Sequence, residues 1–274
     1  MSFYRKTMKQ KTRLPTTAIW ANDDDVVPVE IAGLPELVLV AGGTFQMGGY
    51  VTEGEEPVHR VTVSTYCLGK YPVTVQQYRA FCAATGRSMP DGHNSWDCSE
   101  HAPVVNVTFD DAMSYCDWLC AIHGGSWRLP GEAEWEYAAR GGNQSMGYTY
   151  SGSNDLSAVG WFGGNSSGCA IVIGLKQANE LGIYDMSGNV WEWCRDWYEA
   201  DYYAISTVLN PQGPVSGTQR VLRGGAWDEI PITCRVAHRG HRAPEEYYDN
   251  CGFRVALSPT GRIDQGQSPS STGG

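Results

Sequence analysis

The sequence has no apolar run that approaches the roughly 20 residues needed to span a bilayer. The start of the chain also lacks the apolar core of a secretory signal peptide. We therefore expect no transmembrane segment and no export signal. A cytoplasmic or phage-borne protein fits both absences.

Basic residues are scarce. The 274 residues include 20 Lys and Arg against 30 Asp and Glu, which gives a formal net charge of −10. A nucleic acid repels an acidic surface, so we expect no nucleic-acid partner. The N-terminal arm is locally basic, and we interpret it as solvated rather than as a nucleic-acid tail.

Cysteine pairs with metal-site spacing are also missing. The chain has nine cysteines, an odd number, and no two of them stand in a CxxC pair. This pattern argues against zinc and favours reduced thiols over a disulfide framework.

Aromatic residues and glycine are abundant, with 10 Trp, 15 Tyr and 33 Gly. This composition predicts a fold rich in irregular loops that large planar side chains hold in place. The length suits one domain with a substantial core. We expect an N-terminal arm at residues 1–35, one α+β domain at 36–258 and a disordered tail at 259–274.

Local patterns predict several elements. The run from Leu37 through Met47 predicts a strand, a glycine turn and a second strand, and alternation predicts another strand over 59–66. Thr74 introduces one predicted helix, and Thr108 introduces another that ends at Gly124. A shorter helix is predicted over 132–139, and short strands between loops from about residue 158.

Several motifs along the chain together resemble the formylglycine-generating enzyme (sulfatase-modifying factor) family. They are GGTFQMG at 42–48, PVTVQQY at 72–78, PVVN at 103–106, RLPGEAEWEY at 128–137, LGIYDMSGNVWEW at 181–193, RGGAW at 223–227 and GFR at 252–254. The resemblance implies an irregular, loop-rich C-type-lectin-like fold, with short antiparallel strands and two main helices.

The family to which the resemblance points includes several functions. It contains copper-dependent oxidases that make formylglycine, the lectin-like half of iron-dependent sulfoxide synthases, and non-enzymatic variable proteins of diversity-generating retroelements. Segments 161–168 and 179–185 look closest to the variable proteins. Fold alone does not choose among these functions.

The resemblance also bears on copper. The oxidases hold a cuprous ion between two cysteines five residues apart, after the Gly-Gly turn. Here Glu229 occupies the first position. Cys234 falls on the second position when counted from the glycines, and outside the pair when counted back from Gly252. Soft thiolates select Cu(I), and one thiol with a carboxylate does not suffice. We expect no copper and no catalytic residue of the family type.

A calcium site is implied by the same resemblance. It would take side-chain oxygens from Asp185 and Glu192, and backbone carbonyls from Gly188 and Val190. Hard oxygen ligands on a tight loop suit Ca²⁺ in a structural role. Alternatively, Asp185 and Asn189 satisfy backbone groups of their own loop. The arginines at 223, 239 and 254 match scaffold positions, and we expect them to pair with buried carboxylates.

The residues between these fixed points form the candidate ligand-binding set. We predict a non-catalytic protein that uses a variable-type surface to bind a protein or glycan, with Trp227, Tyr247 and Tyr248 as aromatic anchors. The predicted ligand-binding residues are Trp227, Asp228, Glu229, Ile230, Ile232, Thr233, Val236, His238, His241, Glu246, Tyr247, Tyr248 and Asn250.

Three other interpretations stay open. Glutamates at 229, 245 and 246 cannot arise from adenine-directed change of Asn codons, so they would be fixed positions or signs of an undiversified gene. The segment could also be a routine surface loop. In the third, the protein is a metal-dependent oxidoreductase of the formylglycine-generating or sulfoxide-synthase type, with His238 or His241 near the metal.

Overall fold

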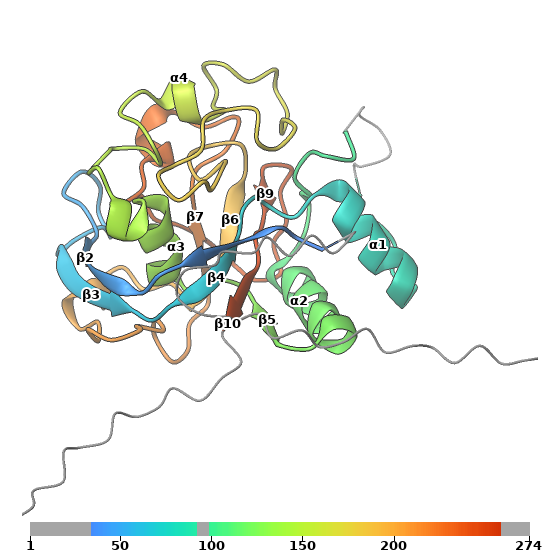
Figure 1. The fold of residues 1–274 in the computed structure, drawn as a ribbon, viewed down its shortest axis with the longest axis horizontal. Helices are drawn as coiled ribbons and strands as arrows, with labels where there is room; N and C mark the ends of the chain where they lie inside the picture. Colours follow the sequence, from blue (N-terminus) through green and yellow to red (C-terminus); the bar gives the residue numbers. More distant parts are fainter. Residues whose placement is uncertain (1–33, 92–98, 259–274) are drawn as a thin grey trace, which may run out of the picture.

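The computed structural model describes residues 34–91 and 99–258 (Figure 1). The predicted arm, apart from residues 34 and 35, and the predicted tail lie outside the described residues. Long loops connect short elements throughout the described chain, as the glycine and aromatic content predicts. No helix within these two ranges is both long and apolar enough to cross a membrane.

The helices are few and mostly short. They are α1 (Val75–Thr85), α2 (Phe109–His123), α3 (Glu132–Ala139) and α4 (Leu156–Val159), with 3-10 turns η1 (Gly142–Gln144), η2 (Tyr202–Ala204) and η3 (Pro231–Cys234). The strands are β1 (Leu37–Val40), β2 (Gly43–Met47), β3 (His59–Val63), β4 (Tyr66–Gly69), β5 (Ser126–Arg128), β6 (Trp191–Trp197), β7 (Arg220–Arg223), β8 (Gly240–Arg242), β9 (Cys251–Gly252) and β10 (Ala256–Ser258).

The strands form three small sheets. Their orders are β1-β4-β10-β5, β2-β3 and β8-β7-β6-β9. All the pairings are antiparallel except β6 with β9, which is parallel. The C-terminal strand β10 lies between β4 and β5, so the end of the domain closes onto its beginning.

Both long helices begin where the sequence predicts. The Thr74 side chain accepts a hydrogen bond from the Gln77 backbone N–H, and Thr108 accepts one from Asp111, so each helix starts with a capping box. The two helices lie side by side at one end of the molecule (Figure 1). Phe81 and Tyr115 pack edge to face between them, with ring centroids 5.5 Å apart.

One hydrophobic core lies around α1 and α2, and a second one surrounds α3. Trp135 and Tyr137 are almost fully buried, and α3 contacts β2, β3, β6 and β7. Nearly every side of this helix is buried, and two of its carboxylates, Glu132 and Glu136, are therefore buried as well. Buried carboxylates require cationic partners, and the C-terminal segment supplies them.

Candidate functional site

Buried arginine–glutamate pairs anchor the chain between residues 223 and 254. The pairs are Arg223–Glu136, Arg235–Glu55, Arg239–Glu132 and Arg254–Glu192. Glu132 and Glu136 both lie on α3, Glu192 lies on β6 and Glu55 precedes β3, so the pairs tie the segment to three separate parts of the fold. The expectation that the arginines at 223, 239 and 254 pair with buried carboxylates is confirmed.

Two of these carboxylates are held ionised. Burial alone would raise the pKa of Glu136, but Arg140 and Arg223 hold that pKa below its usual range. Burial opposes ionisation of Glu55 as well, yet bonds from His238 and Arg235 hold its pKa well below its usual range. The charge pairs therefore persist at neutral pH and fix the base of the segment.

A double-glycine turn follows β7. Gly224 and Gly225 have φ of 102° and 73°, in the left-handed region that favours glycine. A Cβ on Gly225 would lie 2.6 Å from the Cys234 Sγ atom. The turn therefore brings the residues just before Trp227 against η3.

Two stretches of the chain meet after this turn. The Trp227 Nε1–H donates to the Asp249 carbonyl at 3.3 Å, and the Asn250 amide donates to the Asp228 carboxylate at 3.0 Å. Residues 227–233 and 245–250 thus form one surface, which we call the display face. It contains most of the predicted ligand-binding residues.

A neighbouring loop supports the display face from one side. The Ser166 hydroxyl donates to the Trp227 carbonyl at 2.7 Å, and the Gly163 N–H donates to the Glu229 carbonyl at 2.9 Å. Sequence reasoning noted segment 161–168 for its resemblance but did not include it in the site. Its Gly, Asn and Ser content indicates a loop, while its contact partner lies more than sixty residues away in the chain.

The display face exposes large apolar side chains. Ile230 is 62% exposed, Tyr247 57%, and Ile232 and Tyr248 39% each. Trp227 is half-buried. Apolar and aromatic groups left in solvent beside one another are typical of a surface that binds a partner.

Three predicted ligand-binding residues lie elsewhere. Val236 is 2% exposed and packs in the α3 core, so its prediction as a surface residue is wrong. The residue follows buried Arg235, whose pairing with Glu55 draws the backbone inward. His238 Nδ1 lies 3.2 Å from the Thr52 hydroxyl and 3.4 Å from Glu55, while His241 stacks on Tyr198 with ring centroids 4.1 Å apart.

The residues at the position where the resemblance places copper do not fit a cuprous ion. Glu229 offers hard oxygens, and these already accept hydrogen bonds from Trp191 Nε1 and the Thr233 hydroxyl, each at 3.1 Å. Burial raises the pKa of the Cys234 thiol to about 12, and nearby Glu229 adds to that rise. A neutral thiol beside a carboxylate is a poor ligand set for Cu(I).

Of the two carboxylates predicted to bind calcium, one has an oxygen without a hydrogen-bond partner and the other is fully paired. Asp185 is buried, its Oδ2 accepts from the Gly174 N–H at 2.8 Å, and its Oδ1 has no hydrogen-bond partner. Burial raises the Asp185 pKa to about 6. Both oxygens of Glu192 already bind Arg254 at 2.6 Å. Gly188 and Val190 lie in the same buried loop.

The alternative for that loop has a structural basis. Asn189 accepts from the Ile171 N–H at 2.9 Å and donates to the Ile171 carbonyl at 3.0 Å. Its side chain therefore satisfies backbone groups, as Asx residues in loops do. Within residues 34–91 and 99–258, no group of three His, Cys, Asp or Glu side chains is arranged to hold a metal ion. Calcium binding stays a prediction.

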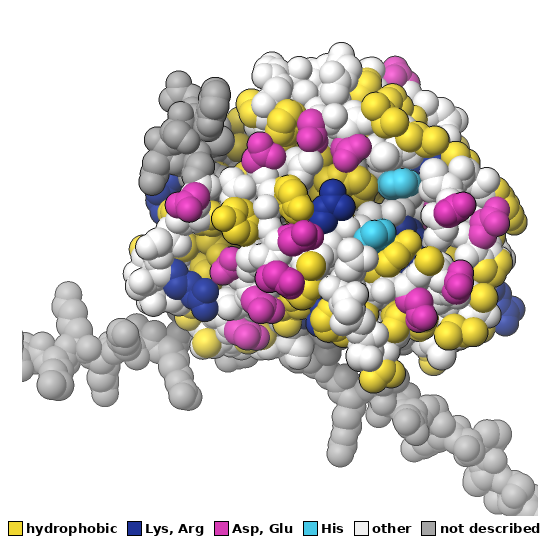
Figure 2. Space-filling view, turned by 180° about the vertical axis from the view of Figure 1, so that it is seen from behind, with side chains coloured by type: hydrophobic (Ala, Val, Ile, Leu, Met, Phe, Trp, Pro, Cys, Tyr) yellow, Lys and Arg dark blue, Asp and Glu magenta, His cyan; other side chains and the backbone are white. Residues whose placement is uncertain are grey.

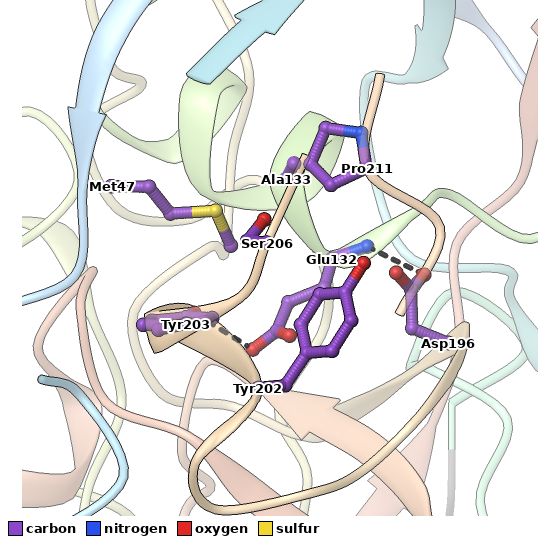
Figure 3. Close-up of a pocket in the computed structure, with 8 residues that line it drawn as sticks. All are labelled: Met47, Glu132, Ala133, Asp196, Tyr202, Tyr203, Ser206 and Pro211. Atoms are coloured by element: carbon purple, nitrogen blue, oxygen red, sulfur yellow. Dashed lines mark hydrogen bonds between the residues drawn. The ribbon is translucent and has the colours of Figure 1, made fainter. Parts of the chain in front are cut away.

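A small cavity of about 10 Å³ lies beneath η2, lined by Met47, Glu132, Ala133, Asp196, Tyr202, Tyr203, Ser206 and Pro211 (Figure 3). The Asp196 carboxylate points at the start of α3 and accepts from the Glu132 backbone N–H at 2.8 Å. Burial, with the nearby Glu132 charge, raises the Asp196 pKa to about 7. The cavity has room for one water molecule and no larger ligand.

A wider cleft of about 410 Å³ is lined by residues outside the display face. Its lining residues are Leu34, Pro35, Glu36, Tyr71, Pro72, Thr74, Gln76, Gln77, Ala80, His101 and Ile173. None of the predicted ligand-binding residues borders it.

Comparisons with known proteins agree with the motifs. Residues 23–259 match the sulfatase-modifying factor enzyme 1-like domain family. The chain is 32% identical over 301 residues to the formylglycine-generating enzyme of Thermomonospora curvata, with 85% of this chain and 96% of that enzyme covered. The solved variable protein 1 of Treponema denticola superposes with a TM-score of 0.73 at 28% identity, covering 82% of this chain and 95% of that one.

A third relative is much longer than this chain. The serine/threonine-protein kinase pkn1 of Chlamydia pneumoniae is 34% identical over 245 residues, which cover 81% of this chain and 38% of the kinase. This chain therefore spans well under half of that relative's length. The motifs, the fold and the match over residues 23–259 together show that the chain belongs to the sulfatase-modifying factor (formylglycine-generating enzyme) family.

Proposed function

We propose that this protein is a non-catalytic ligand-binding member of its family and that the display face is its binding surface. The single observation that carries the proposal is Glu229. This carboxylate stands where the resemblance places a copper thiol, and it is bonded into the surface by Trp191 and Thr233.

A rigid base supports this role. The display face lies between the buried Arg223–Glu136 and Arg254–Glu192 pairs, and its two stretches are joined by hydrogen bonds. Preorganised side chains lose little conformational entropy when they bind a partner, so such a surface can bind without refolding. Exposed Tyr247 and Ile230 supply the apolar contacts.

The structural likeness to a protein named a variable protein also supports binding over catalysis. In this proposal the ligand is a protein or a glycan that contacts residues 227–233 and 245–250. Whether the gene is diversified is a separate question, which a neighbouring reverse-transcriptase gene with a near-copy of the last coding segment would answer.

An activity assay tests the proposal. Purified protein is incubated in air with cuprous ion and a sulfatase-derived cysteine peptide, and the peptide is analysed by mass spectrometry. The formylglycine-generating enzyme of T. curvata serves as the positive control. We expect the cysteine to remain unmodified; formylglycine in the peptide overturns the proposal and favours the oxidoreductase alternative.

We also propose a structural calcium ion at the loop of Asp185, whose buried Oδ1 lacks a partner. A bound ion stabilises the folded state by mass action, so calcium is expected to raise the melting temperature and a chelator to lower it. Asp185→Asn should lose this response, and Asp155→Asn serves as the control because Asp155 caps α4 elsewhere. An unchanged melting temperature contradicts the proposal and leaves Arg254 as the partner of Glu192.

A further inference from the structure

The charges of the display face are unbalanced. Its acidic residues are Asp228, Glu229, Glu245, Glu246 and Asp249, all exposed or half-exposed. Two arginines of the same segment, Arg235 and Arg239, are buried and neutralised by Glu55 and Glu132. Arg242 is the exposed arginine of the stretch 227–250.

The hydrogen bonds that these carboxylates accept do not neutralise their negative charge. Asp228 accepts from the Asn250 amide, Glu229 from Trp191 and Thr233, and Glu246 from the Ala243 N–H. All of these donors are neutral. Among the described residues, none of the five acids takes part in an ion pair.

The same surface offers an aromatic ring to a cation. The guanidinium of Arg242 lies 5.1 Å from the Tyr248 ring centroid, in a cation–π contact. Tyr247, at 57% exposure, is the neighbouring ring and has no such contact among the residues described. An incoming Lys or Arg side chain can pack on it while its charge faces the carboxylates.

The chain as a whole is also acidic. The chain carries a formal charge of −10, and Figure 2 shows acidic side chains spread across one face with few basic ones between them. A surface of one sign draws oppositely charged partners and disfavours like-charged ones. The hydroxyls of an uncharged glycan can donate hydrogen bonds to these carboxylates, but such a ligand gains no attraction between opposite charges.

We infer that the ligand of the display face is a basic protein segment, one in which Lys or Arg side chains alternate with apolar residues. The inference rests on the proposed binding function and specifies its partner. The basic groups meet Asp228, Glu245 and Asp249, and the apolar residues meet Ile230 and Tyr247.

A selection experiment tests it. Random 12-residue peptides displayed on phage are selected in parallel on the wild type and on Tyr247→Ala. Clones that bind the wild type but not Tyr247→Ala are those that bind at the display face. We expect these clones to be enriched in Lys and Arg; clones of neutral or acidic composition overturn the inference but leave the binding function standing. Finding no such clones counts against the binding function itself.

The dissociation constant of one selected basic peptide is then measured on charge-removing variants, to separate the contribution of these carboxylates from that of net charge. The triple variant Asp228→Asn, Glu245→Gln, Asp249→Asn should weaken binding by about tenfold or more. The matched control is Glu56→Gln, Asp117→Asn, Asp201→Asn, which removes three exposed carboxylates elsewhere. It should change the dissociation constant by less than about twofold. Equal losses in the two variants would show that only net charge matters, and would overturn the assignment to this surface.

Discussion

The indole N–H of Trp191 donates to Glu229 Oε1 at 3.1 Å. This bond joins β6 to the first residues of the display face. It places a carboxylate, rather than a thiol, next to the buried Cys234 of η3.

Truncating that carboxylate should loosen the surface. Glu229→Ala leaves the Trp191 Nε1 without its acceptor, and we expect a loss of about 1 kcal/mol in the free energy of unfolding. Glu229→Gln keeps an acceptor and should lose less. Urea unfolding of the two variants measures the difference, and equal stabilities would show that the bond does not support the fold.

The pair Glu192–Arg254 predicts a larger effect. Both groups are fully buried, and Glu192→Gln removes the counter-charge of Arg254. We expect a loss of about 3–5 kcal/mol, because an unpaired buried charge is costly. The control is Glu100→Gln, whose partner Arg79 is exposed, where the loss should stay below about 1 kcal/mol. Chemical denaturation distinguishes the two, and similar losses would contradict the account.

Alanine at position 225 tests the double-glycine turn. Gly225 has a φ of 73°, and a Cβ there would lie 2.6 Å from the Cys234 Sγ and 3.0 Å from the Thr233 carbonyl oxygen. Gly225→Ala should cost about 3 kcal/mol through strain and crowding. Gly86 has a similar φ of 74° with no atom within 4 Å, so Gly86→Ala should cost only about 1 kcal/mol. Equal costs would indicate that η3 moves aside.

Asp196 predicts a dependence of stability on pH. Its pKa rises from 3.8 to about 7 on folding, so the folded state binds this proton more tightly than the unfolded state. The stabilising contribution is full below about pH 4 and is lost as the pH rises towards 7. Asp196→Asn, which stays neutral and keeps an acceptor for the Glu132 N–H, should gain stability relative to the wild type over that window.

The control for Asp196 is Asp117→Asn, an exposed carboxylate on α2. Urea midpoints of wild type and both variants, measured across the pH range, give the difference curves. A constant offset between Asp196→Asn and the wild type would contradict the assignment of the raised pKa.

Local signals in the sequence were sufficient for α1, α2 and α3, while the one-turn helix α4 was not predicted. Thr74 with Gln77, and Thr108 with Asp111, lie within four residues of each other and form the capping boxes that the sequence predicts. The predicted strand over 59–66 is instead two strands, because pairing is interrupted at Ser64, whose N–H binds the Asn210 side chain rather than a neighbouring strand. A partner 146 residues away leaves no local pattern.

The site could be predicted only in part for the same reason. The family motifs located the display face and its aromatic residues. They did not reveal that Val236 turns inward, because this depends on the pairing of Arg235 with Glu55, 180 residues earlier. Nor does any local pattern indicate that Trp191 binds Glu229 or that Ser166 holds Trp227.

A cuprous-ion titration tests the central claim, that the family's copper site is absent here, most directly. The protein is titrated anaerobically against a chromogenic Cu(I) chelator, with Glu229→Cys, which places thiols at positions 229 and 234, as the informative variant. We predict that the wild type removes no stoichiometric copper from the chelator and that Glu229→Cys competes better. One equivalent of Cu(I) held tightly by the wild type would contradict the account.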